Sequence, residues 1–364
     1  MILVAALQGQ QPVLPLMPVV EPGVPAFLLQ PAAVTRWTRA IKAAPMFPPV
    51  IAANRVYVTT LPGLLTAYDL SGGDELWAAD PIADQQIAVD DNHVYVAGGE
   101  AIHALSAQTG AAAWHTPTGT LTAPPVAKDG WVIVTPSRRT LALRAADGTA
   151  VWSRDNALQR DRVTIAGDLL IVPLRTGIVQ ALDLKTGETR WETPVGGFPA
   201  EALVVGDRVY VGTTDKKFYC LKLASGTIDW PWKVGAEIRG SATADLERVY
   251  FAGLDNVVRA VDRIHGAQRW QRGVPFRPLM GPRIAAGAVL VAGPVPDLRI
   301  LNARTGVESG KLSFPDPLVI APAIGEIDGA VAAAGVTGGL NESWKLILVS
   351  HRSALPAFTA SIPR

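Results

Sequence analysis

Few residues in this sequence have the types and spacing that catalysis or metal binding requires. Its one cysteine, Cys220, stands where other copies of a repeat carry alanine, which favours a small core residue. The histidines show no HxH or HExxH spacing that would place two of them on one metal ion. They are His93, His103, His115, His265 and His351. With no nucleophile elbow, P-loop or G-x-G-x-x-G motif, the sequence predicts no catalytic site, metal site or cofactor.

The elements that would position any functional residue come from a phrase of eleven residues, A-x-D-x-x-T-G-x-x-x-W. It recurs in six strong copies, and a seventh at 300–310 keeps the glycine but lacks the tryptophan. The six tryptophans are 37 to 40 residues apart, the period expected of propeller blades. They are Trp77, Trp114, Trp152, Trp191, Trp230 and Trp270.

Each copy has the pattern of a small antiparallel sheet. Apolar runs such as 55–60 and 177–183 predict strands, and the Thr-Gly or Asp-Gly dipeptide predicts a tight turn. A further short apolar run precedes each pair, so four strands per repeat predict a propeller blade. Three strands near the C-terminus lack a fourth, which the segment around Trp37 can supply. We therefore predict an all-β fold: an eight-bladed β-propeller of four-stranded antiparallel blades, the last closed by the N-terminal strand around Trp37.

The tryptophans, Trp37 included, are interpreted as structural. Burying one indole removes roughly 150–250 Å² from water, and one indole per blade can dock neighbouring blades together. The carboxylates Asp69, Asp183 and Asp262 recur just before the turn, where a side chain can accept backbone N–H bonds. Because a role that recurs in several blades serves the fold, we assign these residues to blade docking and turn formation.

The phrase resembles the pyrroloquinoline quinone (PQQ) type propeller repeat, over roughly residues 35–350. This family contains quinoprotein dehydrogenases and non-enzymatic relatives such as the outer-membrane assembly factor BamB. For the dehydrogenases, the resemblance implies a disulfide between adjacent cysteines beside the quinone and an acidic calcium site. Cys220 cannot form that pair, so the similarity to BamB is the closer one, and no cofactor is expected.

Composition and the ends of the chain bear on location. Charged residues make up 18% of the chain and the formal net charge is +1, so bulk charge predicts no attraction to nucleic acid or membranes. The apolar run 1–7 is followed by many prolines, which favours either a truncated signal peptide or a plain leader, with a proline-rich tether. We expect a leader at 1–33, a propeller at 34–352 and a tail at 353–364. We also expect no transmembrane segment, and a periplasmic or otherwise exported protein with no lipobox cysteine.

The candidate binding residues lie in loops. In each blade, the connection to the next blade and the turn between the second and third strands emerge on one side of the disc, the connection face. The other two turns emerge on the opposite face. Blades three to six place eleven basic and six acidic residues on the connection face, whereas nine acidic and four basic residues are assigned to the opposite face. Arginine and aromatic side chains are enriched in binding hot spots. The candidate partner-binding residues are Arg138, Arg139, Arg160, Arg162, Arg175, Phe198, Arg239, Phe276, Arg277 and Met280.

This polarity has two interpretations. Acidic turns can arise simply because aspartate stabilises turns. Alternatively, the basic face docks an acidic partner protein or a small anionic ligand. The predicted function is a non-catalytic, monomeric, BamB-like binding or scaffold protein with a protein partner, in cell-envelope assembly or another protein–protein interaction role, and no nucleic-acid partner. The alternatives are a PQQ-dependent dehydrogenase of reduced size and a sensor module for a small ligand.

Overall fold

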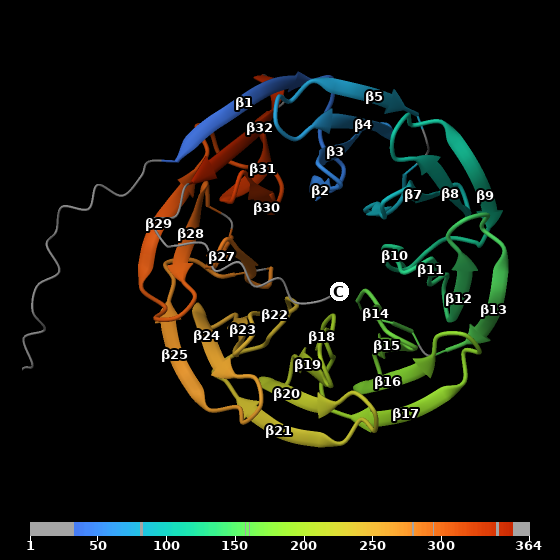
Figure 1. The fold of residues 1–364 in the computed structure, drawn as a ribbon, viewed down its shortest axis with the longest axis vertical. Coiled ribbons are helices and arrows are strands. Elements are labelled where there is room, and N and C mark those ends of the chain that lie inside the picture. The colour runs from blue at the N-terminus through green and yellow to red at the C-terminus, as the bar shows by residue number, and fades with distance from the viewer. Residues whose placement is uncertain are drawn as a thin grey trace, which may run out of the picture. The chain divides into compact units, whose positions relative to one another are not determined.

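The computed structural model describes residues 33–80, 83–156, 158–159, 161–278, 280–293, 295–339 and 342–351. Within these ranges the chain forms 32 strands and no helix. The strands make eight separate four-stranded antiparallel sheets, arranged around a central axis as the blades of a propeller (Figure 1). The predicted eight-bladed propeller is therefore confirmed.

Blades 1 to 4 follow one another along the chain. Blade 1 contains β2 (Val50–Ala52), β3 (Arg55–Thr60), β4 (Leu64–Asp69) and β5 (Glu75–Ala79). Blade 2 contains β6 (Ala88–Val89), β7 (His93–Gly98), β8 (Ala101–Ser106) and β9 (Ala112–Pro117). Blade 3 contains β10 (Val126–Lys128), β11 (Trp131–Val134), β12 (Arg139–Arg144) and β13 (Ala150–Asp155). Blade 4 contains β14 (Thr164–Ala166), β15 (Leu169–Pro173), β16 (Ile178–Asp183) and β17 (Thr189–Pro194).

Blades 5 to 8 complete the ring. Blade 5 contains β18 (Leu203–Val205), β19 (Arg208–Gly212), β20 (Lys217–Lys222) and β21 (Ile228–Lys233). Blade 6 contains β22 (Thr243–Ala244), β23 (Arg248–Gly253), β24 (Val257–Asp262) and β25 (Gln268–Gly273). Blade 7 contains β26 (Arg283–Ala285), β27 (Ala288–Val291), β28 (Asp297–Asn302) and β29 (Glu308–Ser313). Blade 8 contains β30 (Ala323–Ile327), β31 (Ala330–Gly339), β32 (Glu342–His351) and β1 (Val34–Ile41).

Blade 8 combines the two ends of the described chain. Its strand order is β1-β32-β31-β30, so β1 is the outermost strand of a blade whose other strands come from the C-terminal part. The two strands pair in antiparallel register, with Trp37 opposite Leu348 and Ile41 opposite Trp344. Figure 1 shows the blue β1 beside the red β32. The closure predicted around Trp37 is confirmed. The predicted leader, apart from Ala33, and the predicted tail lie outside the described residues.

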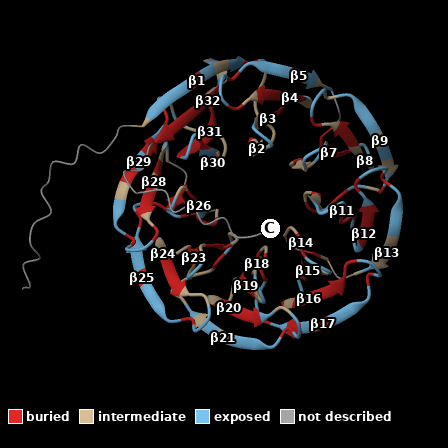
Figure 2. Ribbon diagram, in the orientation of Figure 1, coloured by how far each residue is buried: buried red, intermediate tan, exposed pale blue. Residues whose placement is uncertain are grey.

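The core lies in the two middle strands of each blade. In β7, for example, five consecutive residues are buried, from Val94 to Gly98. Because both faces of a middle strand pack against neighbouring blades, such a strand is apolar throughout and does not alternate. The outermost strands alternate instead, since β17 buries Trp191 and Thr193 between exposed residues. Figure 2 shows this change from buried middle strands to exposed outer strands.

A tryptophan closes each of seven seams, a seam being the contact between the outer strand of one blade and the following blade. The Trp270 indole Nε1 donates to the Ala303 carbonyl oxygen at 2.9 Å, and the ring lies against Gly306. Gly306 has a φ of 69°, and a Cβ there would lie 2.6 Å from the ring, so only glycine suits the turn. The equivalent bonds, at 2.8 to 3.0 Å, join Trp37 to Leu70, Trp77 to Ala107, Trp114 to Ala145, Trp152 to Leu184, Trp191 to Leu223 and Trp230 to Ile264.

The eighth seam, between blades 7 and 8, is built differently. The outer strand β29 has Gly310 at the tryptophan position, and the buried imidazole of His351 lies against it. A Cβ on Gly310 would lie 2.7 Å from the imidazole Nε2. The imidazole Nδ1 is buried without a hydrogen-bond partner, and desolvation by burial lowers the pKa of His351. The seam beside the ends of the described chain therefore uses histidine in place of tryptophan.

The recurring aspartates form the turns before the tryptophan strands. Asp183 Oδ1 accepts the backbone N–H groups of Lys185 and Thr186, both at 2.9 Å. Its other oxygen accepts from Arg190 at 2.6 Å. The Arg190 hydrogen bond holds the pKa of Asp183 low, at about 2. Asp262 makes the same set of bonds in blade 6, so this residue serves the turn.

Candidate functional site

Three arginines predicted to bind a partner are exposed on the connection face. Arg138 and Arg139 lie at the turn between β11 and β12, and Arg175 lies at the turn between β15 and β16. Arg139 donates to the Thr118 carbonyl oxygen at 3.3 Å. Arg138 and Arg175 form no ion pair with any residue that the structure describes. Their guanidinium groups therefore remain available for a carboxylate from another molecule.

Further candidates lie on the connections that lead into blades 5, 6 and 7. Phe198 is 47% exposed, and its backbone N–H donates to the Thr214 hydroxyl at 2.8 Å, which fixes this connection. Arg239 is exposed and pairs with Glu237 at 2.7 Å. Arg277 is exposed, and Met280 is half-buried. The connection face thus carries exposed arginines and one exposed aromatic ring across several blades.

Two predicted candidates are less exposed than the sequence interpretation expects. Phe276 is only 6% exposed and packs in the core of blades 6 and 7, where Gly293 leaves room for its ring. Arg162 is half-buried, and its Nη2 donates to Gln86 Oε1 at 2.5 Å. Burial lowers the pKa of Arg162. Arg160 lies outside the described residues.

Many acidic residues of the opposite face have partners within the protein. Asp245 Oδ1 accepts the backbone N–H of Glu247 at 2.8 Å and that of Arg248 at 2.6 Å. Other carboxylates pair with basic side chains at 2.7 to 3.9 Å. These pairs are Asp129 with Lys128, Asp168 with Lys185, Asp207 with Arg208, Glu247 with Arg248 and Asp328 with Arg36. Turn formation and local ion pairs account for much of the acidity of this face.

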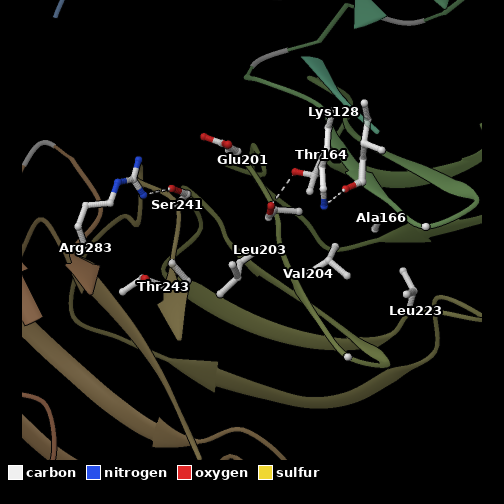
Figure 3. Close-up of a pocket in the computed structure, with 15 residues that line it drawn as sticks. Lys128, Thr164, Ala166, Glu201, Leu203, Val204, Leu223, Ser241, Thr243 and Arg283 are labelled. Atoms are coloured by element: carbon white, nitrogen blue, oxygen red, sulfur yellow. Dashed lines mark hydrogen bonds between the residues drawn. The ribbon is translucent and has the colours of Figure 1, made fainter. Parts of the chain in front are cut away.

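The innermost strands line a cavity of about 520 Å³ at the centre of the ring. Its walls come from β10, β14, β18, β22 and β26, the innermost strands of blades 3 to 7, and from the loops beside them. The charged lining residues are Lys128, Glu201 and Arg283 (Figure 3). Arg283 Nη1 donates to the Ser241 hydroxyl at 2.9 Å, and Lys128 Nζ donates to the Ile165 carbonyl oxygen at 3.4 Å.

Sequence reasoning did not identify this cavity. Glu201 is one of the six acidic residues that the sequence places on the connection face, and no sequence pattern singles out Arg283. The lining residues from Lys128 to Arg283 span more than 150 positions, and only the closed ring places them around one space. No spacing within one repeat carries a signal for a site that is built from five blades.

The residues of this chain do not fit the quinone and the calcium ion that the resemblance to quinoprotein dehydrogenases implies. Cys220 is buried in the core between β19, β20 and β23, and it has no cysteine partner. Burial raises the pKa of its thiol to about 12. The described residues also contain no group of three acidic, histidine or cysteine side chains that could hold a metal ion. We therefore derive no chemistry from a quinone or from calcium.

The described residues form no helix that is long and apolar enough to span a membrane.

Comparisons with known proteins agree with one another. The family model described as outer membrane protein assembly factor BamB matches residues 62–204 and 196–335. The BamB of Moranella endobia (strain PCIT) is 26% identical over 310 residues, which cover 75% of this chain and 79% of that protein. The BamB of Burkholderia pseudomallei (strain K96243) is 27% identical over 274 residues, covering 66% of this chain and 70% of that protein.

Among solved structures, the crystal structure of BamB from Moraxella catarrhalis superposes with a TM-score of 0.70 at 17% identity. It covers 89% of this chain and 99% of that one. The quinohemoprotein alcohol dehydrogenase of Comamonas testosteroni superposes with a TM-score of 0.66 at 14% identity, covering 91% of this chain and 78% of that one. At these identities both structures show a shared fold and nothing about activity.

Proposed function

Because the chain belongs to the family of the outer membrane protein assembly factor BamB, we propose that it is a non-catalytic scaffold that binds a protein partner during outer-membrane protein assembly. The family match extends over most of the propeller, and the similar proteins described above carry the same name. The relatives are named for assembly and not for a reaction. This agrees with the absence of a quinone-type cysteine pair in the sequence.

The observation that carries the proposal is that several arginines on the connection face are exposed and have no ion-pair partner among the described residues. Arg138, Arg175 and Arg277 are exposed and form no ion pair with any described residue. On the opposite face, by contrast, many charges are already paired within the protein. A protein surface that presents unpaired guanidinium groups favours an acidic partner, since it steers encounter and adds charge-assisted hydrogen bonds on contact. Phe198 supplies an exposed ring to the same face.

We propose that the protein acts outside the cytoplasm, in the cell envelope, where the named function of its relatives takes place. The propeller itself, residues 34–352, is the part proposed to bind. The proposed partner surface consists of Arg138, Arg139, Arg175, Phe198, Arg239, Arg277 and Met280.

Gene deletion in the organism that encodes this chain tests the function. We expect the amount of outer-membrane proteins in the envelope to fall, and a wild-type copy to restore it. A copy with Arg138→Glu, Arg175→Glu and Arg277→Glu should not restore it. The matched control carries Asp91→Lys, Asp168→Lys and Asp207→Lys on the opposite face, and it should restore these proteins. Unchanged outer-membrane protein after deletion would contradict the proposed function.

A further inference from the structure

The proposed partner surface does not explain the central cavity. Its volume of about 520 Å³ is within the range of roughly 300–1,000 Å³ typical of small-molecule sites. Its walls combine apolar side chains such as Leu203 and Val204 with the hydroxyl groups of Thr164, Ser241 and Thr243. A cavity of this size that offers both apolar and polar contacts can hold a small ligand.

Two of the three charged lining residues are left without a charged partner. Lys128 pairs with Asp129 at 3.9 Å and donates to the Ile165 carbonyl oxygen. Glu201 forms no hydrogen bond or ion pair with a residue in the described ranges, and Arg283 forms no ion pair there. In the view of Figure 3, Glu201 lies between Arg283 and Lys128. The two unpaired groups carry opposite charges and line the same space.

The carboxylate of Glu201 is placed where it loses solvation. It is half-buried, and this burial raises its pKa, although the neighbouring Arg162 and Arg283 lower it. A partly desolvated carboxylate that lines the cavity can accept a hydrogen bond from a ligand ammonium group.

Arg283 presents the complementary group. One of its guanidinium nitrogens is held by the Ser241 hydroxyl at 2.9 Å, which fixes the direction of the side chain. Its remaining N–H donors have the fork geometry that binds a carboxylate through two parallel hydrogen bonds. Glu201 and Arg283 lie close enough for Arg283 to lower the pKa of Glu201, yet they form no ion pair with each other.

We propose that this cavity binds a small zwitterion of amino-acid to short-peptide size, with the ligand carboxylate on Arg283 and the ligand ammonium on Glu201. A purely anionic ligand would face the Glu201 carboxylate, and a purely cationic ligand would face the Arg283 guanidinium. A zwitterion satisfies both groups at once, and Leu203 and Val204 offer apolar contact to its side chain. This site does not depend on the proposed partner surface, so either proposal can fail without the other.

Calorimetric titration of the full-length protein with three related dipeptides tests the proposal. The zwitterion L-alanyl-L-alanine is compared with its N-acetyl form, which lacks the ammonium, and with its C-terminal amide, which lacks the carboxylate. We expect the zwitterion to bind at least tenfold more tightly than either blocked form. Glycine and trialanine, as smaller and larger zwitterions, define the size that the cavity accepts.

Variants assign the two charges to their residues. Glu201→Gln should weaken zwitterion binding about tenfold and leave the N-acetyl dipeptide unaffected, because only the ammonium contact is lost. Arg283→Gln should weaken zwitterion binding about tenfold and leave the C-terminal amide unaffected. The matched control Arg304→Gln removes an exposed arginine that does not line the cavity, and it should bind all three dipeptides like the wild type. Thermal unfolding of each variant establishes that it is folded.

Equal affinity for the three dipeptides would overturn the proposal. The absence of binding by every zwitterionic probe at concentrations up to about 10 mM would also overturn it, because even a small ligand in a formed pocket should bind more tightly than that. Unchanged zwitterion affinity in Glu201→Gln and Arg283→Gln would place any binding elsewhere and would also overturn it.

Discussion

The seven tryptophan seams and the connection face are built from the same repeat, yet their side chains differ in whether they have partners within the protein. In each seam, an indole donates to a backbone carbonyl oxygen of the next blade and lies against the glycine of a turn. On the connection face, Arg138 and Arg175 lie in the turn between the second and third strands of their blades, Arg277 lies in a connection between blades, and none of the three has an ion-pair partner in the described structure. Residues whose contacts recur around the ring build the fold, and residues whose contacts are missing remain for binding.

The largest expected effect on stability comes from a seam. Trp270→Ala removes a buried indole and its hydrogen bond to Ala303, so we expect a loss of about 3–5 kcal/mol in the free energy of unfolding. Urea unfolding measures it. The control Arg277→Ala on the connection face should change stability by no more than about 0.5 kcal/mol. A loss of less than about 1 kcal/mol in the free energy of unfolding of Trp270→Ala would contradict the stabilising role of this seam.

For the connection face we expect a loss of partner binding without a loss of stability. The triple variant with Arg138→Glu, Arg175→Glu and Arg277→Glu should weaken partner binding about 100-fold, because three unpaired cations become anions that repel an acidic partner. Its unfolding midpoint in urea should stay close to that of the wild type, since these side chains form no internal ion pairs among the described residues. Strong destabilisation without a binding defect would show that these arginines serve the fold.

The stability that the eighth seam contributes should depend on pH through His351, whereas the seven tryptophan residues of the other seams do not titrate. Burial lowers the pKa of His351 below its ordinary value of about 6.5. The unfolded chain therefore takes up the proton first. The stability from neutral His351 is complete above about pH 6.5 and is lost as pH falls below it. Urea midpoints at about pH 7.5 and 5.5 should fall further in the wild type than in His351→Gln. An equal fall in both proteins would contradict this role.

The smallest effect is expected at a recurring turn. Asp183→Asn weakens the bond to Arg190, and we expect a loss of about 0.5–1.5 kcal/mol in the free energy of unfolding at neutral pH. The carboxylate has a folded-state pKa of about 2, below the ordinary value, so its contribution is present above about pH 3.9 and lost as pH falls through 2. Acid unfolding of the wild type and variant measures this difference. Identical acid curves would contradict it.

The fold was predictable from the sequence because copies of one sequence repeat encode the blades. The spacing of the tryptophans set the number of blades, and Trp37 stood at the right distance to close the last one. The fate of individual loop residues was not predictable in the same way. Phe276 turned inward because Gly293, in the next blade, leaves space for its ring. Glu201 and Arg283 met at one cavity only because the ring closes.

The most direct test of the partner surface compares two positions in blade 4 on opposite faces. A photo-crosslinking amino acid replaces Arg175 on the connection face in one variant and Asp168 on the opposite face in another, each expressed in the native cell. We expect irradiation to join a cell-envelope protein to the Arg175 position and not to the Asp168 position. The same crosslink at both positions, or only at Asp168, would contradict the assignment of the connection face as the binding surface.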